Sequence, residues 1–227
     1  MAFQLKRTSQ VHQQTGVRIV VYGMSGAGKT CLIPTLPAPL VISAEGGLLS
    51  IAGADVPYIE VNSYDSLMEA YRFVAESQEA ATFQSIAVDS ISEIAELVLA
   101  HEKRTNKDGR AAYGEMATQV TEIIRAFRDL KGKHVYFSAK AEKSQDETGK
   151  MLYGPSMPGN KLGQQIPYLV DEVFALRVER AQDGSVTRAL QCQPDSAWQA
   201  KDRSGRLAQW EAPDLGAVIS KISGAQQ

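Results

Sequence analysis

The sequence predicts an α/β fold with a mostly parallel central sheet and helices on both of its faces. From Val17 onward, short apolar runs alternate with segments of helical period, which is typical of strands joined by crossover helices. The first apolar run opens directly into a glycine-rich turn. Two later apolar runs flank the pair Asp183-Gly184, which predicts a β-hairpin near the C-terminus.

Length and composition indicate one large domain. The 227 residues, 44% of them hydrophobic, can bury a sizeable core, and we expect a flexible leader at 1–16, a core at 17–222 and a disordered tail at 223–227. With 24 basic and 26 acidic residues, the formal charge of −2 excludes a polycation that coats nucleic acid, so any nucleic-acid surface must be a local patch. Because the leader has no apolar core and no apolar run reaches about 18 residues, we expect a soluble, intracellular protein.

The first half of the core predicts three strands and one helix. The strands begin at Val17, at Pro39 and at Val56. The segment 62–77 changes to helical period, with Ser63 as its N-terminal cap. Strand and helix therefore alternate, as a parallel sheet requires.

The second half continues the alternation and then departs from it. A strand at 84–89, helices at 92–103 and 114–132, and a strand at 133–140 follow in order. Residues 139–165 are rich in glycine and lysine without apolar periodicity, which predicts a long loop that is either functional or mobile. The hairpin occupies 171–193, and a short helix follows at 213–222.

A phosphate-binding loop is the most specific motif. The stretch GMSGAGKT, Gly23 to Thr30, fits G-x-x-x-x-G-K-[ST] directly after a strand. Its glycines allow successive N–H groups to point at phosphate oxygens, and the next helix would add its positive end. Lys29 would bridge the outer phosphates of ATP and Thr30 would bind Mg²⁺, while Pro34 should make the helix short. The expected nucleotide-binding residues are Gly23, Ser25, Gly26, Ala27, Gly28, Lys29, Thr30 and Cys31.

Two carboxylates are candidates for the remaining chemistry. Asp89 ends a predicted strand and suits a magnesium-binding role, but its neighbour Ser90 cannot act as a base. Glu45 lies just beyond the strand that begins at Pro39, at the edge of a parallel sheet where ligands bind. If that strand lies near the first, Glu45 faces the terminal phosphate and can orient water. From composition alone, an exposed loop carboxylate is the better interpretation of Glu45.

Several segments resemble the RecA-type recombinases. The segment PLVISAEGGLLSIAG resembles the strand that leads into their catalytic glutamate, and IAVDSIS resembles their Walker B strand, where aspartate also precedes serine. The segment MPGNKLGQQ resembles their second DNA-binding loop, and AKDRSGRL resembles the place where two basic residues reach the ATP of the neighbouring subunit. Lys201 and Arg203 would be those residues. In one departure, Ala139 and Lys140 occupy the region where a glutamine often senses the terminal phosphate.

Residues 17–222 are similar to short phage proteins with a RecA core, which act as single-strand annealing or recombination ATPases. The resemblance implies a RecA-like three-layer fold and ATP hydrolysis, stimulated by DNA, at the interfaces of a homo-oligomeric filament or ring. It also implies Glu45 as the residue that orients water, and Lys201 with Arg203 as catalytic residues from the next subunit. The implied partners are single-stranded DNA and a single-strand DNA-binding protein, in the cytoplasm of a bacterial host.

Two loops are candidates for binding single-stranded DNA, because basic side chains can follow phosphates and tyrosines can stack on bases. The candidate residues are Arg110, Tyr113, Lys143, Lys150, Tyr153, Asn160 and Lys161. Acidic residues alternate with these lysines, so a merely soluble loop explains any single residue equally well. Two other functions stay open: a small-molecule kinase with the same phosphate loop, and a non-hydrolysing, nucleotide-gated assembly or loading factor.

Overall fold

The computed structural model describes residues 16–145, 149–159 and 162–224. Its strands are β1 (Arg18–Gly23), β2 (Pro39–Ser43), β3 (Tyr58–Glu60), β4 (Ser85–Asp89), β5 (His134–Gln145), β6 (Met151–Pro155), β7 (Glu172–Arg180), β8 (Val186–Gln191), β9 (Lys201–Asp202) and β10 (Trp210–Glu211). Its α-helices are α2 (Tyr64–Glu76), α3 (Ile91–Thr105), α4 (Gly109–Arg128), α5 (Leu162–Leu169) and α6 (Leu215–Ser223). Its 3-10 helices are η2 (Thr30–Thr35), η3 (Leu48–Ala54) and η4 (Glu79–Thr82).

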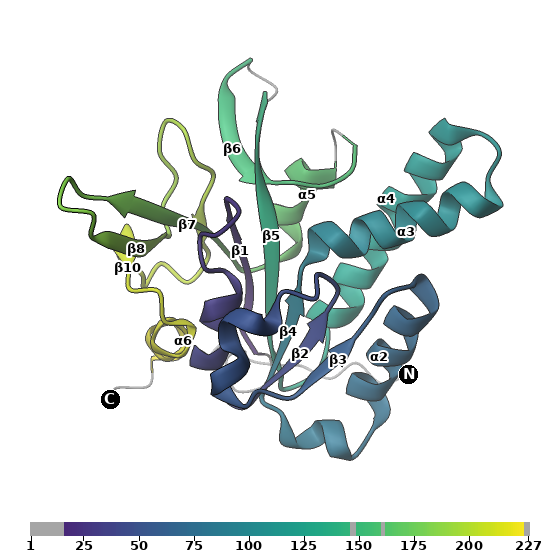
Figure 1. Ribbon diagram of the computed structural model, residues 1–227, viewed down its shortest axis with the longest axis horizontal. Helices are drawn as coiled ribbons and strands as arrows, with labels where there is room; N and C mark the ends of the chain where they lie inside the picture. The colour runs from purple at the N-terminus through teal and green to yellow at the C-terminus, as the bar shows by residue number, and fades with distance from the viewer. Residues whose placement is uncertain (1–15, 146–148, 160–161, 225–227) are drawn as a thin grey trace, which may run out of the picture.

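One mixed sheet organises the chain (Figure 1). Its strand order is β10-β8-β7-β1-β5-β4-β2-β3. The six strands from β7 to β3 in that order are parallel, and β8 and β10 are antiparallel additions at one edge. The predicted α/β P-loop NTPase fold is therefore confirmed, with its mostly parallel sheet and its C-terminal hairpin β7–β8.

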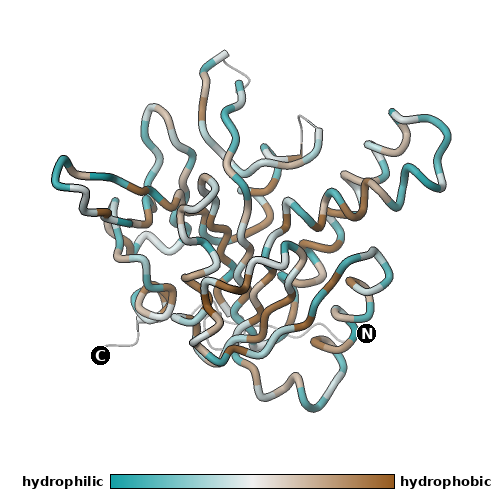
Figure 2. Tube along the Cα trace, in the orientation of Figure 1, coloured by the Kyte–Doolittle hydropathy of each residue, from teal (hydrophilic) through white to brown (hydrophobic). Residues whose placement is uncertain are grey.

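Side-chain alternation along the strands builds two cores. On β1, Val20 and Tyr22 pack into a core shared with α2, α3, α4 and α5, whereas Ile19 and Val21 pack against η2, η3 and α6. Figure 2 shows hydrophobic residues concentrated along the central strands and hydrophilic residues at the outer hairpins. The sheet is thus the middle of three layers, as predicted.

The helices α3 and α4 form a helical hairpin that projects away from the sheet (Figure 1). Ser90 caps α3 and Asp108 caps α4, each by accepting a hydrogen bond from a backbone N–H of the first turn. The predicted cap Ser63 of α2 is confirmed: its hydroxyl accepts from the Ser66 N–H, and the Ser66 hydroxyl accepts from the Ser63 N–H in return. The second helix, α4, begins at Gly109, earlier than predicted, and ends before Asp129 instead of at Gly132.

The long loop predicted at 139–165 is wrong. The strand β5 continues to Gln145 and pairs antiparallel with β6, so that the two strands form a two-stranded arm above the sheet, and α5 follows. The outer half of β5 alternates between exposed and half-buried residues, since little packs on either face there. Without an apolar face, this part of the strand has no hydrophobic alternation that the sequence could reveal.

The ends of the chain lie largely outside the described residues. The predicted leader falls there except for Gly16, and so does 225–227 of the predicted tail. The other two tail residues belong to the last helix, because α6 includes Ser223 and Gly224 is its left-handed cap. Within the described ranges, no helix is both long and apolar enough to cross a membrane.

Candidate nucleotide-binding site

The carboxyl ends of the central strands converge on one cavity. Gly23 at the end of β1 pairs with Lys140 of β5, and Ser43 at the end of β2 pairs with Asp89 of β4. A cavity of about 550 Å³ opens beyond these ends. Its lining residues are Met24, Ser25, Gly26, Gly28, Lys29, Thr30, Cys31, Glu45, Gly47, Ser50, Lys140, Ala141 and Arg188. Most of the residues predicted to bind nucleotide therefore line one cavity.

The phosphate loop has the backbone that its glycines predict. Gly26 and Gly28 adopt φ values of 74° and 102°, in the left-handed region that favours glycine. The helix after the loop is shorter than the sequence suggested: η2 is a six-residue 3-10 helix that contains Pro34. The predicted contribution of a helix dipole is therefore reduced, so the loop N–H groups and Lys29 are the main groups available to bind phosphate.

The Lys29 side chain folds back across its own loop. Its Nζ donates to the carbonyl oxygens of Gly23 and Met24, at 2.9 Å and 3.2 Å. Burial lowers the pKa of Lys29, while the negative charges of Glu45 and Asp89 act in the opposite direction. The ammonium group is thus surrounded by acceptors, close to the two candidate carboxylates.

Thr30 and Asp89 form an oxygen-rich pair that suits Mg²⁺. The Thr30 hydroxyl donates to Asp89 Oδ2 at 2.8 Å, and the hydroxyl of Ser138, on the intervening strand β5, donates to Asp89 Oδ1. Mg²⁺ prefers oxygen ligands and usually keeps few protein ligands together with phosphates and water. Over the described ranges, no cluster of three or more His, Cys, Asp or Glu residues could hold a metal. The donors present fit a Mg²⁺ ion that nucleotide phosphates and water would complete.

Glu45 reaches the cavity by a route that differs from the predicted one. Its strand β2 is not beside β1, because β5 and β4 lie between them. The backbone N–H groups of Ala44 and Glu45 instead donate to the carbonyl oxygen of Asp89, at 2.8 Å and 3.3 Å, which bends the chain over the end of β4. The Ser90 hydroxyl donates to Glu45 Oε1 at 2.6 Å. Ser90, which cannot be a base, therefore positions the carboxylate that could be one.

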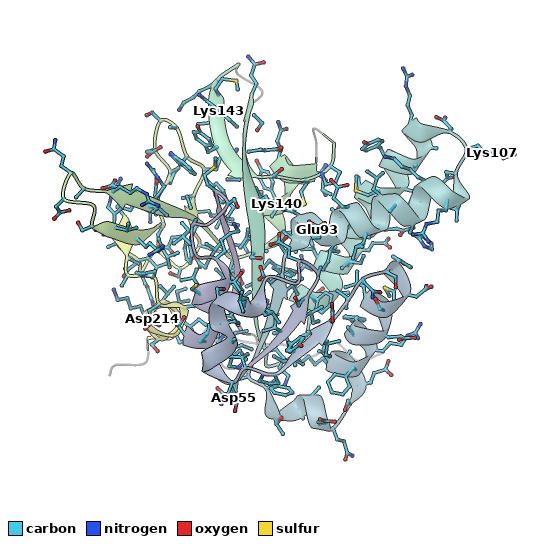
Figure 3. The ribbon with its side chains drawn as sticks, in the orientation of Figure 1. Asp55, Glu93, Lys107, Lys140, Lys143 and Asp214 are labelled. Atoms are coloured by element: carbon cyan, nitrogen blue, oxygen red, sulfur yellow. The ribbon has the colours of Figure 1, made fainter. Side chains whose placement is uncertain are left out.

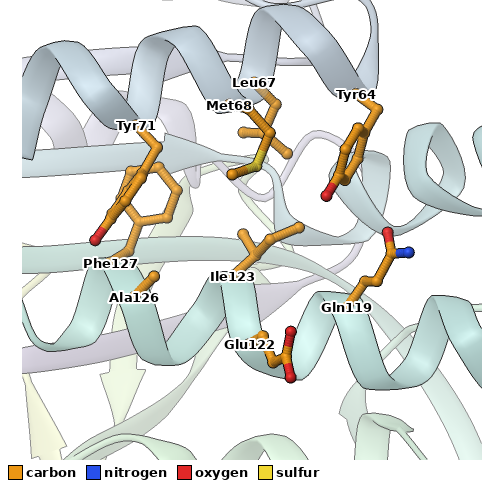
Figure 4. A pocket seen from close by; sticks show the side chains of 9 residues that line it. All are labelled: Tyr64, Leu67, Met68, Tyr71, Gln119, Glu122, Ile123, Ala126 and Phe127. Carbon is orange, nitrogen blue, oxygen red and sulfur yellow. The ribbon is translucent and has the colours of Figure 1, made fainter.

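A second cavity, between α2 and α4, is a poor candidate for a nucleotide (Figure 4). It has a volume of about 140 Å³, below the range of roughly 300–1,000 Å³ that is usual for small-molecule pockets. Neither lysine nor arginine is among its lining residues, which are Tyr64, Leu67, Met68, Tyr71, Gln119, Glu122, Ile123, Ala126 and Phe127. The cavity at the phosphate loop is the candidate site.

Comparison with known proteins gives the family. The AAA domain family matches residues 15–204, which is most of the chain and includes the phosphate loop, Glu45 and Asp89. The chain belongs to the AAA domain family. This AAA domain is therefore a P-loop ATPase domain.

Individual relatives are distant. The AAA domain is similar to the SPbeta prophage-derived uncharacterized protein YorG of Bacillus subtilis (strain 168), with 26% identity over 143 residues. That match covers 60% of this chain and 44% of the relative, so the chain spans less than half of that protein's length. A KaiC-like protein, PH0186 from Pyrococcus horikoshii OT3, superposes with a TM-score of 0.46 and 14% identity over 78% of this chain and 77% of the other.

Two further cations line the cavity: Lys140, which the sequence placed in the region of the phosphate-sensing glutamine, and Arg188, which the sequence did not indicate. Lys140 of β5 forms an ion pair with Glu93 of α3, with 2.6 Å between Nζ and Oε2, and this hydrogen bond raises the pKa of Lys140. Figure 3 labels both residues, Lys140 on β5 and Glu93 near the start of α3. Arg188 of β8 donates from Nε to the carbonyl oxygen of Ala27 at 2.9 Å. Arg188 and Ala27 are 161 residues apart in the sequence, so no local pattern indicates their contact. Only the fold of the AAA domain shows that Arg188 lies at the phosphate loop.

Lys201 and Arg203, the predicted catalytic cations of a neighbouring subunit, do not line the cavity of their own chain. Lys201 Nζ donates to the carbonyl oxygens of Pro167 and Val170, at 2.6 Å each, and Arg203 pairs with Asp171 at 2.7 Å. Burial lowers the pKa of Lys201. To reach the nucleotide of another AAA domain, both side chains would have to exchange these contacts.

The predicted DNA-binding residues lie on two projecting elements of the AAA domain. Lys143 and Tyr153 face each other across the β5–β6 arm, with Lys143 Nζ 5.6 Å from the Tyr153 ring centroid, and the exposed Lys150 lies just before β6. One face of the Tyr153 ring is occupied, because it stacks on Trp198 with 4.2 Å between ring centroids.

The other projecting element is the α3–α4 hairpin. Tyr113 on α4 is 42% exposed, and Lys103 Nζ lies 5.2 Å from its ring centroid. Arg110 is exposed in the first turn of α4. A Cβ atom placed on Gly159 would lie 3.6 Å from the Tyr113 ring, so the two predicted DNA-binding segments approach each other here. Asn160 and Lys161 lie outside the described residues.

Proposed function

We propose that this P-loop domain is a Mg-ATP-dependent recombination ATPase that binds single-stranded DNA and promotes annealing or strand pairing. The observation that carries the proposal is the position of Glu45. Its carboxylate is fixed by Ser90 at the wall of the cavity that Lys29 and Thr30 also line. A fixed carboxylate beside a phosphate site can orient a water molecule for attack on the terminal phosphate.

Each residue would have a distinct role in hydrolysis. Lys29 would leave the carbonyl oxygens of its own loop and bind the β- and γ-phosphates, because a charged phosphate is the stronger acceptor. Thr30 and Asp89 would bind Mg²⁺, which neutralises charge on the phosphates. Glu45, held by Ser90, would accept a hydrogen bond from the attacking water.

Direct contacts between the cavity and the two projecting elements support stimulation by DNA. Ser90, the N-terminal cap of α3, donates to Glu45, and Glu93 in the first turn of α3 pairs with Lys140 of β5. Ser92 of the same turn accepts from the Lys140 N–H and donates to the Ser156 carbonyl after β6. Single-stranded DNA that binds and orders the α3–α4 hairpin or the β5–β6 arm would therefore also affect the start of α3, which positions Glu45.

The resemblance to RecA-type recombinases extends the proposal beyond one chain. Subunits would assemble into a filament or ring in which Lys201 and Arg203 approach the ATP of the next subunit and stabilise charge in the transition state. A single-strand DNA-binding protein would present the coated DNA. The prophage-derived relative supports a phage origin, with the cytoplasm of a bacterial host as the place of action.

The first experiment measures ATP hydrolysis against protein concentration, with and without single-stranded DNA. Natural protein, Glu45→Gln and Lys201→Ala are compared with Glu79→Gln, which removes an exposed carboxylate on η4, just before the amino end of β4. We expect a rate that rises with concentration and DNA, and that is lost in the first two variants only. A DNA-independent rate that survives Lys201→Ala would favour a kinase, tested with added phosphate acceptors. Tight ATP binding without hydrolysis would favour an assembly or loading factor.

The DNA surface is tested by the salt dependence of single-stranded DNA binding. Lys143→Ala should weaken binding and should make the dependence of log K on log salt shallower, by about 0.7 for one lost phosphate contact. Lys131→Ala is the matched control, because Lys131 is also exposed but precedes the amino end of β5. Equal affinities and slopes for the two variants would remove Lys143 from the DNA surface.

A further inference from the structure

Arg188 lies against the phosphate loop from the C-terminal hairpin. It belongs to β8, opposite Val178 of β7, and its Nε donates to the carbonyl oxygen of Ala27 at 2.9 Å. A Cβ atom placed on Gly28 would lie 3.3 Å from the same nitrogen. Arg188 also lines the cavity of about 550 Å³ together with Lys29 and Thr30. The guanidinium group is thus part of the wall of the nucleotide cavity.

The terminal nitrogens of Arg188 are available to a ligand. Arginine has five N–H donors, and the bond to Ala27 uses only the one on Nε. Within the described part of the chain, Arg188 forms neither an ion pair nor a hydrogen bond through Nη1 or Nη2. Because Nε is fixed on the loop, the planar group presents these nitrogens with little rotational freedom, which favours binding of an anion.

The strand order shows which end of a nucleotide Arg188 would meet. Asp89 and Glu45 follow β4 and β2, which lie on one side of β1, whereas Arg188 is on β8, on the other side. The Mg²⁺ and terminal-phosphate chemistry assigned to Asp89, Glu45 and Lys29 therefore lies toward β4. A nucleotide with its terminal phosphate there extends toward β8 with its α-phosphate and nucleoside.

We propose that Arg188 is a nucleotide-binding residue that contacts the α-phosphate and nucleoside end of ATP bound to the same chain. The assignment rests on the proposed nucleotide binding but on none of the DNA or subunit contacts. ATP and ADP share this end, so Arg188 contributes equally to the binding of both. An interaction that is the same in the ground state and in the transition state changes KM and not kcat.

The test measures the dissociation constants of ATP and ADP by titration calorimetry, and KM and kcat for hydrolysis, for natural protein, Arg188→Gln and Arg180→Gln. Glutamine at 188 keeps an N–H donor for Ala27 but loses the charge. Arg180 is the matched control, because it is an exposed arginine near the turn of the same hairpin. Thermal midpoints identify any variant that fails to fold, and Arg188→Ala, which also loses the charge and for which the same loss is expected, then replaces Arg188→Gln.

We expect Arg188→Gln to bind both nucleotides at least tenfold more weakly and to show the loss in KM, whereas Arg180→Gln matches natural protein. Unchanged ADP affinity in Arg188→Gln, or a loss confined to kcat, would overturn the assignment while leaving the ATPase proposal intact. If natural protein binds neither ATP nor ADP, both proposals are refuted together.

Discussion

Replacing Ser90 by alanine removes one hydroxyl group that makes two contacts of different kinds. Its Oγ donates to Glu45 Oε1 at 2.6 Å and accepts from the Glu93 N–H at 3.3 Å, as the N-terminal cap of α3. The first contact orients the carboxylate in the nucleotide cavity, and the second stabilises a helix. The substitution therefore affects both hydrolysis and folding, and the two effects can be measured separately.

The size of each effect follows from the geometry. A hydrogen bond to a charged group contributes about 1.5–3 kcal/mol. Glu45 is exposed, so water replaces part of the lost bond, and we take the lower end. A transition-state loss of about 1.5 kcal/mol corresponds to roughly a tenfold decrease in kcat. Loss of the cap costs about 1 kcal/mol of unfolding free energy, or about 2–4 °C in thermal midpoint for a chain of this size.

The matched control is Ser63→Ala, which removes the N-terminal cap of α2. Ser63 accepts from the Ser66 N–H at 3.1 Å, and Ser63 does not line the nucleotide cavity. Steady-state ATP hydrolysis and thermal melting should show similar losses of stability in both variants and a loss of kcat in Ser90→Ala alone. Ser90→Thr should restore most of the rate. Equal kcat values for Ser90→Ala and Ser63→Ala would refute the positioning role of Ser90.

Two further predictions concern buried carboxylates. Burial raises the pKa of Glu172 from 4.5 to about 8, and the negative charge of Asp202 adds to this effect. Between these two pH values the folded state binds one proton more than the unfolded state. The free energy of unfolding therefore falls as the pH rises from about 4.5 to about 8. Glu172→Gln should flatten this decline in urea melts at several pH values, and identical pH profiles would contradict it. Asp89→Asn removes the charge beside Thr30, so the Mg²⁺ concentration for half-maximal hydrolysis should rise at least about tenfold; an unchanged requirement in a magnesium titration would exclude Asp89 as a ligand.

Local patterns made the phosphate loop and most core strands predictable. The conformation of the phosphate loop depends on residues within the loop itself, because Gly26 and Gly28 adopt the positive φ values that it needs. The strands β1 and β4 are buried on both faces, so each is a continuous apolar run in the sequence. The cap Ser63 could likewise be read directly, because it acts within one turn of its own helix.

Features that depend on contacts between distant segments could not be predicted in the same way. The sequence predicts that Glu45 faces the terminal phosphate if its strand lies near β1, but β5 and β4 separate the two strands, and backbone hydrogen bonds to the Asp89 carbonyl oxygen bring Glu45 to the cavity instead. Arg188 has no sequence motif, since its role arises from the folding of the C-terminal hairpin over the loop. Lys201 matched a family pattern, yet its Nζ binds carbonyl oxygens near the end of α5 in its own chain.

The arm formed by β5 and β6 extends the central strand β5, whose inner half is held in register by β1 and β4. Lys140 pairs with Gly23 on one side, and from Ala141 onward the same strand pairs only with β6. Because successive side chains on a strand point to opposite faces, the arm can change length in steps of two residues per strand without turning Lys143 or Tyr153 to the other side. Insertion of one residue would reverse the faces of everything beyond it. A change of two residues per strand would therefore alter the reach of the arm, whereas a change of one residue would alter which side chains share a face.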